Sequence, residues 1–210
     1  MAWATTYRSE VDQKTGNFQM KTVVVTALWM KCLAILLGAG AAHANDSAKL
    51  WDALRQGTAF AIMRHALAPG TGDPDKFKVG DCSTQRNLSD TGRKRAREIG
   101  ARFRSNGITK ANVLSSQWCR CRETAELLAL GQVKELPSLN SFFQKFEQRE
   151  TQTKALRKWL MTSRPKGPLV LSTHQVNISA LTGSYTSSGE IVVAQIDADG
   201  KVKVLGSIEN

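Results

Sequence analysis

The sequence predicts an α/β domain: a three-layer sandwich in which a mostly parallel central sheet carries helices on both faces and an antiparallel C-terminal hairpin at its edge. Short apolar runs without polar alternation, typical of strands covered on both faces, alternate with segments of helical periodicity. Strands that alternate with helices usually form a parallel sheet. The last apolar run is joined to an alternating one through Asp199-Gly200, which is a strong hairpin signal.

Residues 1–44 are set apart from this domain as an upstream segment and a cleaved secretory signal peptide. Met30-Lys31 precedes an uncharged run over 32–42, and the run ends in Ala42-His43-Ala44, which is the usual order of such a leader. A start at Met20-Lys21 would give a longer leader with the same cleavage motif, Ala42-His43-Ala44. Because the apolar run is shorter than the roughly 20 residues of a membrane span, we expect a periplasmic or secreted protein without a stable membrane anchor.

Cleavage after Ala44 leaves a single domain over residues 45–210, which is 166 of the 210 residues and a usual size for one core. Its net charge is +9, because four of the 29 basic and two of the 18 acidic residues lie in the leader. Such a charge suits a nucleic acid, an anionic surface or a small anionic substrate. Seven basic residues between Arg86 and Arg104 are interleaved with apolar ones at helical spacing, without stacking aromatics. This pattern favours a solvated helix face over a nucleic-acid site.

The first elements of the domain are a short helix and a buried strand. Ser47 can cap the helix and Gly57 can end it. The strand over 58–63 (TAFAIM) stops abruptly at Arg64-His65, and residues 66–88 follow without any period. Loops of that length are usually functional or disordered.

The later elements alternate in type along the chain. They are a helix from Ser89 to about Ser105, a strand over 113–116, a helix through Leu127 to Gly131, a strand over 133–136, a helix over about 152–162, a strand over 168–173, a short helix after His174, and hairpin strands over 191–196 and 201–205.

Polar residues follow three of the predicted strands. The strands end in Arg64-His65, in Ser115-Ser116 leading to Arg120, and in His174. Ligands of open α/β sheets bind at the carboxyl ends of the strands, so we expect these groups to converge. Arginine can hold two phosphate oxygens, and a neutral imidazole can attack phosphorus to form a phosphohistidine that water later opens. The sequence therefore predicts phosphoryl transfer in which fixed cations stabilise the transition state without a metal.

Three segments together resemble the histidine phosphatase superfamily, also called phosphoglycerate mutase-like: IMRHALAPGTGD, SSQWCRCRETA and LSTHQVNISALTG. The resemblance covers about residues 58–205 and implies a phosphomonoester hydrolase that is phosphorylated on His65. Three further residues are implied to bind phosphate: Arg64, Arg120 and His174. Thr71 lies where members of the family often place another phosphate-contacting polar residue, and Ala66 replaces the usual glycine after the nucleophile.

The proton donor is where the chain departs from the family. Mutase-like members supply a glutamate between the second arginine and the second histidine, and acid-phosphatase-like members an aspartate directly after that histidine. Here that neighbour is Gln175, which we expect to contact substrate. A poor leaving group needs a general acid. We favour Glu190 for this role, with Glu147, Glu150 and Asp73 as alternatives.

Three cysteines remain after cleavage: Cys82, Cys119 and Cys121. One pair should close in an oxidising compartment. Cys119 and Cys121 are too near each other to be a good pair, so we expect Cys82 to bond with one of them. A lone C-x-C lacks the ligand spacing of a zinc site, and no nucleotide or metalloprotease motif occurs. We therefore expect no metal, no cofactor, and activity that survives chelators.

Other functions compete with the hydrolase. The absence of a carboxylate at the family's proton-donor positions also fits a periplasmic protein that binds a phosphate ligand with weak or no turnover. A mutase is disfavoured, because the short segment 131–168 leaves little room for a lid. Phe142, Phe143 and Phe146 are predicted to belong to the core or to a hydrophobic pocket wall. Beyond a small phosphorylated compound, the sequence identifies neither the physiological substrate nor the oligomeric state.

Overall fold

The computed structural model describes residues 46–209. The predicted leader, residues 1–44, lies outside the described residues. Within them, no helix is both long enough and apolar enough to cross a membrane.

Six strands form one sheet in the order β3-β2-β4-β1-β5-β6. Their bounds are β1 Phe60–Arg64, β2 Asn112–Ser115, β3 Val133–Glu135, β4 Leu169–Thr173, β5 Ile191–Ile196 and β6 Val202–Ile208. The first four run parallel to one another. β5 pairs antiparallel with β1, and β6 antiparallel with β5. The predicted parallel sheet with a C-terminal hairpin at its edge is confirmed.

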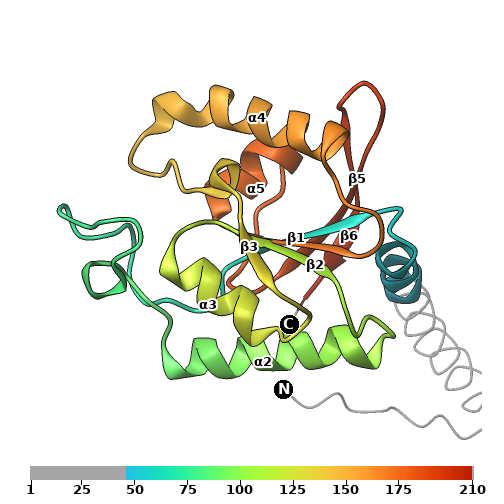
Figure 1. The fold of residues 1–210 in the computed structure, drawn as a ribbon, viewed down its shortest axis with the longest axis horizontal. Helices are drawn as coiled ribbons and strands as arrows, with labels where there is room; N and C mark the ends of the chain where they lie inside the picture. The colour runs from blue at the N-terminus through green and yellow to red at the C-terminus, as the bar shows by residue number, and fades with distance from the viewer. Residues whose placement is uncertain (1–45, 210) are drawn as a thin grey trace, which may run out of the picture. The chain divides into compact units, whose positions relative to one another are not determined.

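Helices cover both faces of this sheet. They comprise residues 46–55, α2 (Asp90–Ser105), α3 (Cys119–Leu127), α4 (Arg149–Thr162) and α5 (Gln175–Thr182). Figure 1 shows α2 and α3 on one side of the sheet and α4 and α5 on the other, so the predicted three layers are confirmed. Single 3-10 turns at Pro137–Leu139 and Phe146–Gln148, which periodicity did not predict, connect β3 to α4.

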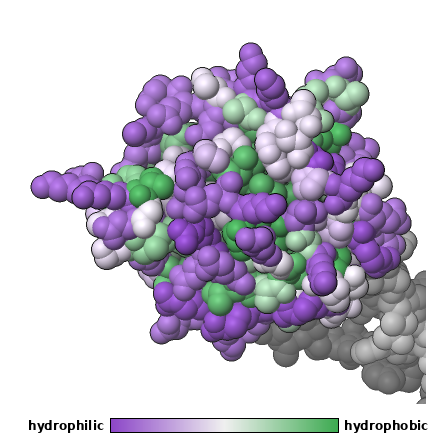
Figure 2. All heavy atoms as spheres, viewed as in Figure 1, coloured by the Kyte–Doolittle hydropathy of each residue, from purple (hydrophilic) through white to green (hydrophobic). Residues whose placement is uncertain are grey.

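Two hydrophobic clusters separate the layers. On one face Ala61 and Met63 of β1 pack in a cluster with Phe103 of α2, and on the other Phe60 and Ile62 pack in a cluster with Leu156 of α4. This arrangement explains the unbroken apolar run of β1, which is covered on both faces. Figure 2 shows the same view of the surface as mostly hydrophilic, with apolar residues visible only in separate patches.

Two of the differences from the predicted boundaries have local reasons. α3 ends at Leu127, short of the predicted Gly131, because Ala129 adopts a positive φ of 52° that ends the helical path. β6 continues to Ile208, beyond the predicted 205, since a register shift between Val193 and Ala194 interrupts the strict alternation on which the prediction relied.

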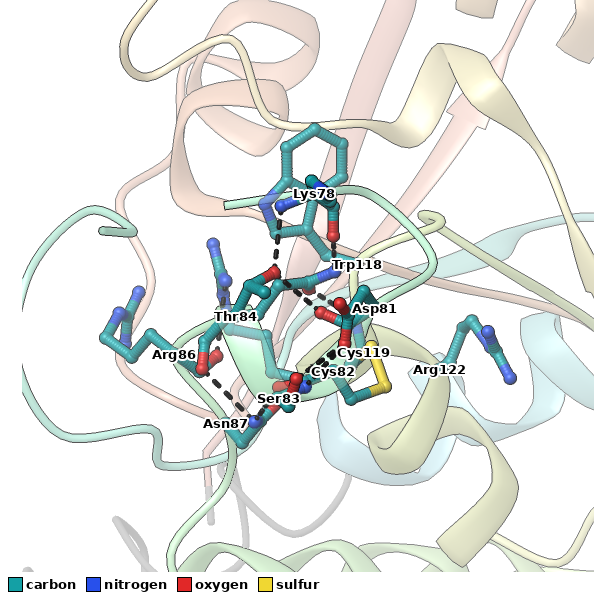
Figure 3. Close-up of a disulfide and its surroundings, with 12 residues drawn as sticks. Lys78, Asp81, Cys82, Ser83, Thr84, Arg86, Asn87, Trp118, Cys119 and Arg122 are labelled. Atoms are coloured by element: carbon teal, nitrogen blue, oxygen red, sulfur yellow. Dashed lines mark hydrogen bonds between the residues drawn. A yellow bond between two sulfur atoms is a disulfide. The ribbon is translucent and has the colours of Figure 1, made fainter. Parts of the chain in front are cut away.

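The long connection after β1 is fastened to the start of α3. Cys82 forms a disulfide with Cys119, while Cys121 stays free and buried. The Gln85 side chain accepts a hydrogen bond of 3.0 Å from the Cys119 amide, one of the helix N–H groups that lack an intrahelical acceptor. Figure 3 shows the loop residues around the disulfide, with the loop held by its own hydrogen bonds. The disulfide and the hydrogen bond from the Cys119 amide to Gln85 together fix this loop against the carboxyl end of the sheet.

Loss of the disulfide should destabilise the domain. The two cysteines are 37 residues apart, and a loop of that length corresponds to roughly 4 kcal/mol of lost chain entropy in the unfolded state. We expect Cys82→Ser to lower the free energy of unfolding in urea by about 2–4 kcal/mol. The wild type in dithiothreitol is the control and should match the variant. Equal stability of the variant and the oxidised wild type would contradict the expectation.

Candidate functional site

The polar groups predicted to converge do meet at the carboxyl ends of three adjacent strands. The His65 amide donates to the Thr173 carbonyl (2.9 Å), and the Ser116 amide to the Ser172 carbonyl (3.0 Å). These bonds continue the sheet one residue past the strands and place the functional side chains beside one another. Four of them line a cavity of about 750 Å³: Arg64, His65, Arg120 and His174. That volume is ordinary for a small-molecule site.

The buried His65 ring has a defined tautomer. Its Nδ1 lies 2.8 Å from the Ala66 carbonyl oxygen, which can only accept, so Nδ1 carries the hydrogen. Arg120 Nε donates to the other nitrogen, Nε2, over 3.3 Å. Burial, followed by the charge of Arg120, lowers the pKa of His65 to about 3. The imidazole is therefore neutral, and its Nε2 lone pair accepts the hydrogen bond from Arg120.

Arg120 is held by a carboxylate from the long loop. Its two terminal nitrogens bind the two oxygens of Asp73 at 2.7 and 3.0 Å, and both side chains are almost fully buried, 3% and 4% exposed. Asp73 also accepts from the Trp118 indole (3.0 Å) and the Arg86 amide (3.1 Å). Burial raises the pKa of Asp73, but the bonds and charge of Arg120 outweigh it and hold that pKa below its ordinary value. Asp73 is thus an ionised partner of Arg120.

His174 packs beside His65, with ring centroids 5.6 Å apart. Arg120 Nη2 faces its Nδ1 at 3.5 Å, and since a guanidinium only donates, Nδ1 is the unprotonated nitrogen. The Nε2 hydrogen then points to Ser116 Oγ, 2.9 Å away, which donates onward to Asn140. Burial and the charge of Arg120 hold the pKa of His174 well below its ordinary value, so this ring is also neutral.

Arg64 contributes a cation at the rim of the same cavity. Its Nη1 donates to the Thr186 carbonyl (3.3 Å), while its buried Nε has no hydrogen-bond partner among residues 46–209. Gln175 fixes Thr186 in turn, because its amide oxygen accepts from the Thr186 amide (2.9 Å) and hydroxyl (2.6 Å). A buried unpaired donor costs free energy. Arg64 Nε is therefore suited to an anionic ligand.

The other predicted residues lie in different places. Thr71 and Gln175 both line the cavity, although the Gln175 amide is engaged with neighbouring protein groups. Glu190 does not line it. The Glu190 carboxylate instead accepts from the amide (2.8 Å) and hydroxyl (3.0 Å) of Ser187, closing its own turn. The geometry gives no support to the catalytic role expected of Glu190.

Sequence reasoning named Asp73 only as an alternative acid and did not identify Arg86 or Trp118 as parts of the site. All three line the cavity. Arg86 Nε donates to the Gly72 carbonyl (2.7 Å), which shapes the loop so that Asp73 reaches Arg120. A signal existed in the loop itself, because an aspartate and an arginine in a long aperiodic connection after the candidate nucleophile suggest an ordered functional loop.

Potential metal ligands do not gather at this site. Among residues 46–209, no group of three or more histidine, cysteine, aspartate or glutamate side chains could hold a metal ion. Arg64, Arg86 and Arg120 supply positive charge around the two histidines instead. The described side chains favour an anion-binding cavity.

Three solved structures with a similar fold are named as phosphatases. They include the protein histidine phosphatase SixA complexed with tungstate (TM-score 0.51, 16% identity, 72% of this chain and 96% of that chain). A putative phosphohistidine phosphatase SixA from Agrobacterium tumefaciens is also similar (TM-score 0.50, 16% identity, 73% of this chain and 99% of that chain). So is a putative alpha-ribazole-5'-P phosphatase from Escherichia coli (TM-score 0.51, 14% identity, 70% of this chain and 94% of that chain). At these identities the likeness shows the fold alone. No curated protein matches the chain.

The family model that matches the chain is that of the histidine phosphatase superfamily (branch 1), over residues 60–168. The match covers more than half of the chain and includes Arg64, His65 and Arg120, while His174 follows it. The resemblance found in the three sequence segments is confirmed. The chain belongs to the histidine phosphatase superfamily.

Proposed function

We propose that this chain is an exported, metal-independent phosphomonoester hydrolase that works through a phosphohistidine on His65. The observation that carries the proposal is the neutral His65 ring, whose Nε2 lone pair lies in a cavity beside Arg64 and Arg120. A histidine that stays unprotonated is a competent nucleophile at any physiological pH.

The reaction has two steps on the same phosphorus atom. In the first, Nε2 of His65 forms a bond to phosphorus as the ester bond to the leaving oxygen breaks, and the leaving oxygen departs as an anion that takes a proton from water. In the second, water attacks the phosphohistidine, and phosphate and the neutral imidazole are restored. The N–H on Nδ1, bound to the Ala66 carbonyl at 2.8 Å, stabilises the positive charge that the ring gains when Nε2 is phosphorylated.

Fixed cations hold the phosphate during both steps. Arg64 offers its unpaired Nε, and Arg120 presents the Nε–H that now faces His65. Charge on the equatorial oxygens of the transition state is stabilised best by donors that need not reorganise. The Arg86 amide and the Trp118 indole hold the Asp73 carboxylate, which in turn keeps Arg120 in place for this purpose. A phosphate dianion beside His174 would also favour the protonated form of that ring, which could then donate.

Proton donation sets the limit on this chemistry. Asp73 is the one carboxylate among the described residues that lines the cavity, and it is already bound to Arg120. We therefore assign to Asp73 the positioning of Arg120 and not general acid catalysis. Esters whose leaving group needs no protonation, such as aryl phosphates, should be cleaved faster than simple alkyl phosphates.

The exported location is supported by the Cys82–Cys119 disulfide, since such bonds persist in oxidising compartments. The predicted leader that would direct export lies outside the described residues. A small phosphorylated compound is the proposed partner, and the basic face of α2 is not proposed as a nucleic-acid site.

A phosphate-binding protein with little turnover is the second candidate. The observation that favours it is the absence of an unpaired carboxylate among the described residues that line the cavity. In that case Arg64, Arg120 and His174 would bind phosphate esters, but the ester bond would not be broken.

Replacing His65 separates the two functions. We expect His65→Ala to hydrolyse p-nitrophenyl phosphate at least about 10³-fold more slowly than the wild type, because no nucleophile remains. Leu67→Ala is the control, since Leu67 is an exposed neighbour outside the cavity lining. Both rates should be unchanged by EDTA. Equal release of p-nitrophenol by the wild type and His65→Ala would rule out the hydrolase and favour the phosphate-binding protein.

Removing the Asp73 carboxylate should destabilise the fold. Asp73→Ala leaves Arg120 as an unpaired buried cation, and breaking a buried pair in this way costs about 3–5 kcal/mol. Urea unfolding measures the change. Asp75→Ala is the matched control, because Asp75 is an exposed aspartate on the same loop and should change stability by less than about 0.5 kcal/mol. Similar small effects of both substitutions would show that the pair contributes little.

Stability should fall as the pH decreases below about 6.5. The pKa of His65 is about 3 in the folded chain, and that of His174 is also lowered, so between these values and the unfolded pKa the unfolded chain binds more protons. The contribution of Asp73, whose pKa is lowered, is lost only below about 4. Urea midpoints from pH 7.5 to 4.5 therefore isolate the histidines. We expect a steady decline that His65→Gln partly removes, and a flat profile would disprove the buried neutral rings.

A further inference from the structure

Exposed aromatic rings gather around the cavity and nowhere else on the described chain. The rings that are exposed among residues 46–209 belong to Phe143 (42%), Phe146 (59%) and Tyr185 (85%), and all three line the cavity. A cluster of exposed apolar side chains, unlike one that stands alone, marks a surface that binds a ligand or a partner. Their position around one cavity indicates that the cavity ligand is what they meet.

The aromatic lining comes from separate parts of the chain. Phe143 and Phe146 lie just before α4, with ring centroids 5.8 Å apart, while Tyr185 follows α5. Phe77, from the loop that the disulfide fastens, packs against Trp118 at 5.5 Å, and both also line the cavity. Phe142 also lines the cavity, but it is only 2% exposed and its ring packs edge-on against Phe146 with centroids 6.5 Å apart. All three phenylalanines thus belong to the predicted pocket wall, and Phe142 is its buried member.

The charges of the cavity limit what can occupy it. Five cations line it, Arg64, Arg86, Arg120, Lys145 and Arg149, against the single carboxylate of Asp73. A purely apolar ligand would leave these cations without counter-charge, and inorganic phosphate alone is far smaller than a cavity of about 750 Å³. A ligand that fits both features has a phosphate at one end and an apolar body attached to it.

We infer that the substrate is a phosphomonoester of an alcohol that carries an aromatic or similarly bulky apolar group. The phosphate lies against His65 and the arginines, and the apolar part of the alcohol packs on Phe143, Phe146 and Tyr185. This subsite deepens the proposed function and rests on it for the identity of the phosphate end. It selects among phosphate esters by the apolar area that they bury.

Phosphonates test the subsite without any turnover, because their carbon–phosphorus bond is not cleaved by hydrolysis of this kind. Calorimetry compares phenylphosphonate with methylphosphonate, which share the anionic group and differ in the apolar body. A ring that buries about 60 Å² of apolar surface gains roughly tenfold in affinity. We expect phenylphosphonate to bind at least about tenfold more tightly to the wild type.

Two variants assign the preference to the rings. In Phe143→Ser/Phe146→Ser the preference should fall to within about threefold, while the affinity for methylphosphonate stays as in the wild type. Met161→Ser is the matched control, because Met161 is 45% exposed on α4 and does not line the cavity. It should keep the full preference. Equal binding of the two phosphonates by the wild type, or an unchanged preference in the double variant, would overturn the inference.

The outcomes also separate this inference from the proposed function. A preference for phenylphosphonate without hydrolysis that depends on His65 would rule out the hydrolase but support the apolar subsite. Hydrolysis that depends on His65, without a preference for phenylphosphonate, would support the hydrolase and rule out the apolar subsite. Sedimentation completes the test: a concentration-dependent dimer of the wild type that the double variant abolishes would mean that the rings cover a second copy of the chain, which contradicts a substrate subsite.

Discussion

The site depends on one buried ion pair, the two-pronged contact between Arg120 and Asp73. Arg120 comes from α3, next to the end of β2, and Asp73 from the loop after β1, so the pair joins two segments that the sheet alone would leave independent. It directs Arg120 Nε at His65 and Nη2 at His174. The disulfide and the Gln85 contact at the start of α3 restrain the same loop. Without this pair the loop would have no charged anchor, and the guanidinium would have no fixed direction.

That arrangement also explains how two histidines remain neutral in a strongly cationic cavity. Burial disfavours the charged form of each ring, and the charge of Arg120 opposes a second positive charge beside it. A carboxylate next to His65 would have raised its pKa and favoured protonation of Nε2. Asp73 is instead bound on the far side of Arg120, where its charge is compensated by four donors. The proposed nucleophile is thus kept unprotonated by its surroundings and needs no separate base.

Much of the fold could be predicted from the sequence, because buried parallel strands have continuous apolar runs and their ends share one edge of a sheet. This reasoning brought Arg64, His65, Arg120 and His174 together correctly. It was weaker wherever side chains choose among nearby partners. Glu190 has the residue type of an acid but bonds to Ser187 in its own turn, and Asp73 was one of several loop polar residues until its distance to Arg120 was known. Periodicity carries no information on such contacts in a loop without regular structure.

In the proposed reaction, Nε2 of His65 carries the phosphoryl group. The most direct measurement is to mix the protein with p-nitrophenyl phosphate, quench in alkali, where phosphohistidine is stable, and locate the phosphoryl group by mass spectrometry and by phosphorus-31 NMR. We expect one phosphoryl group, on the peptide that contains His65, with the chemical shift of an Nε2-linked phosphohistidine. Phosphorylation of His174, attachment through Nδ1 of His65, or hydrolysis that leaves no phosphoprotein at the shortest mixing times would contradict it.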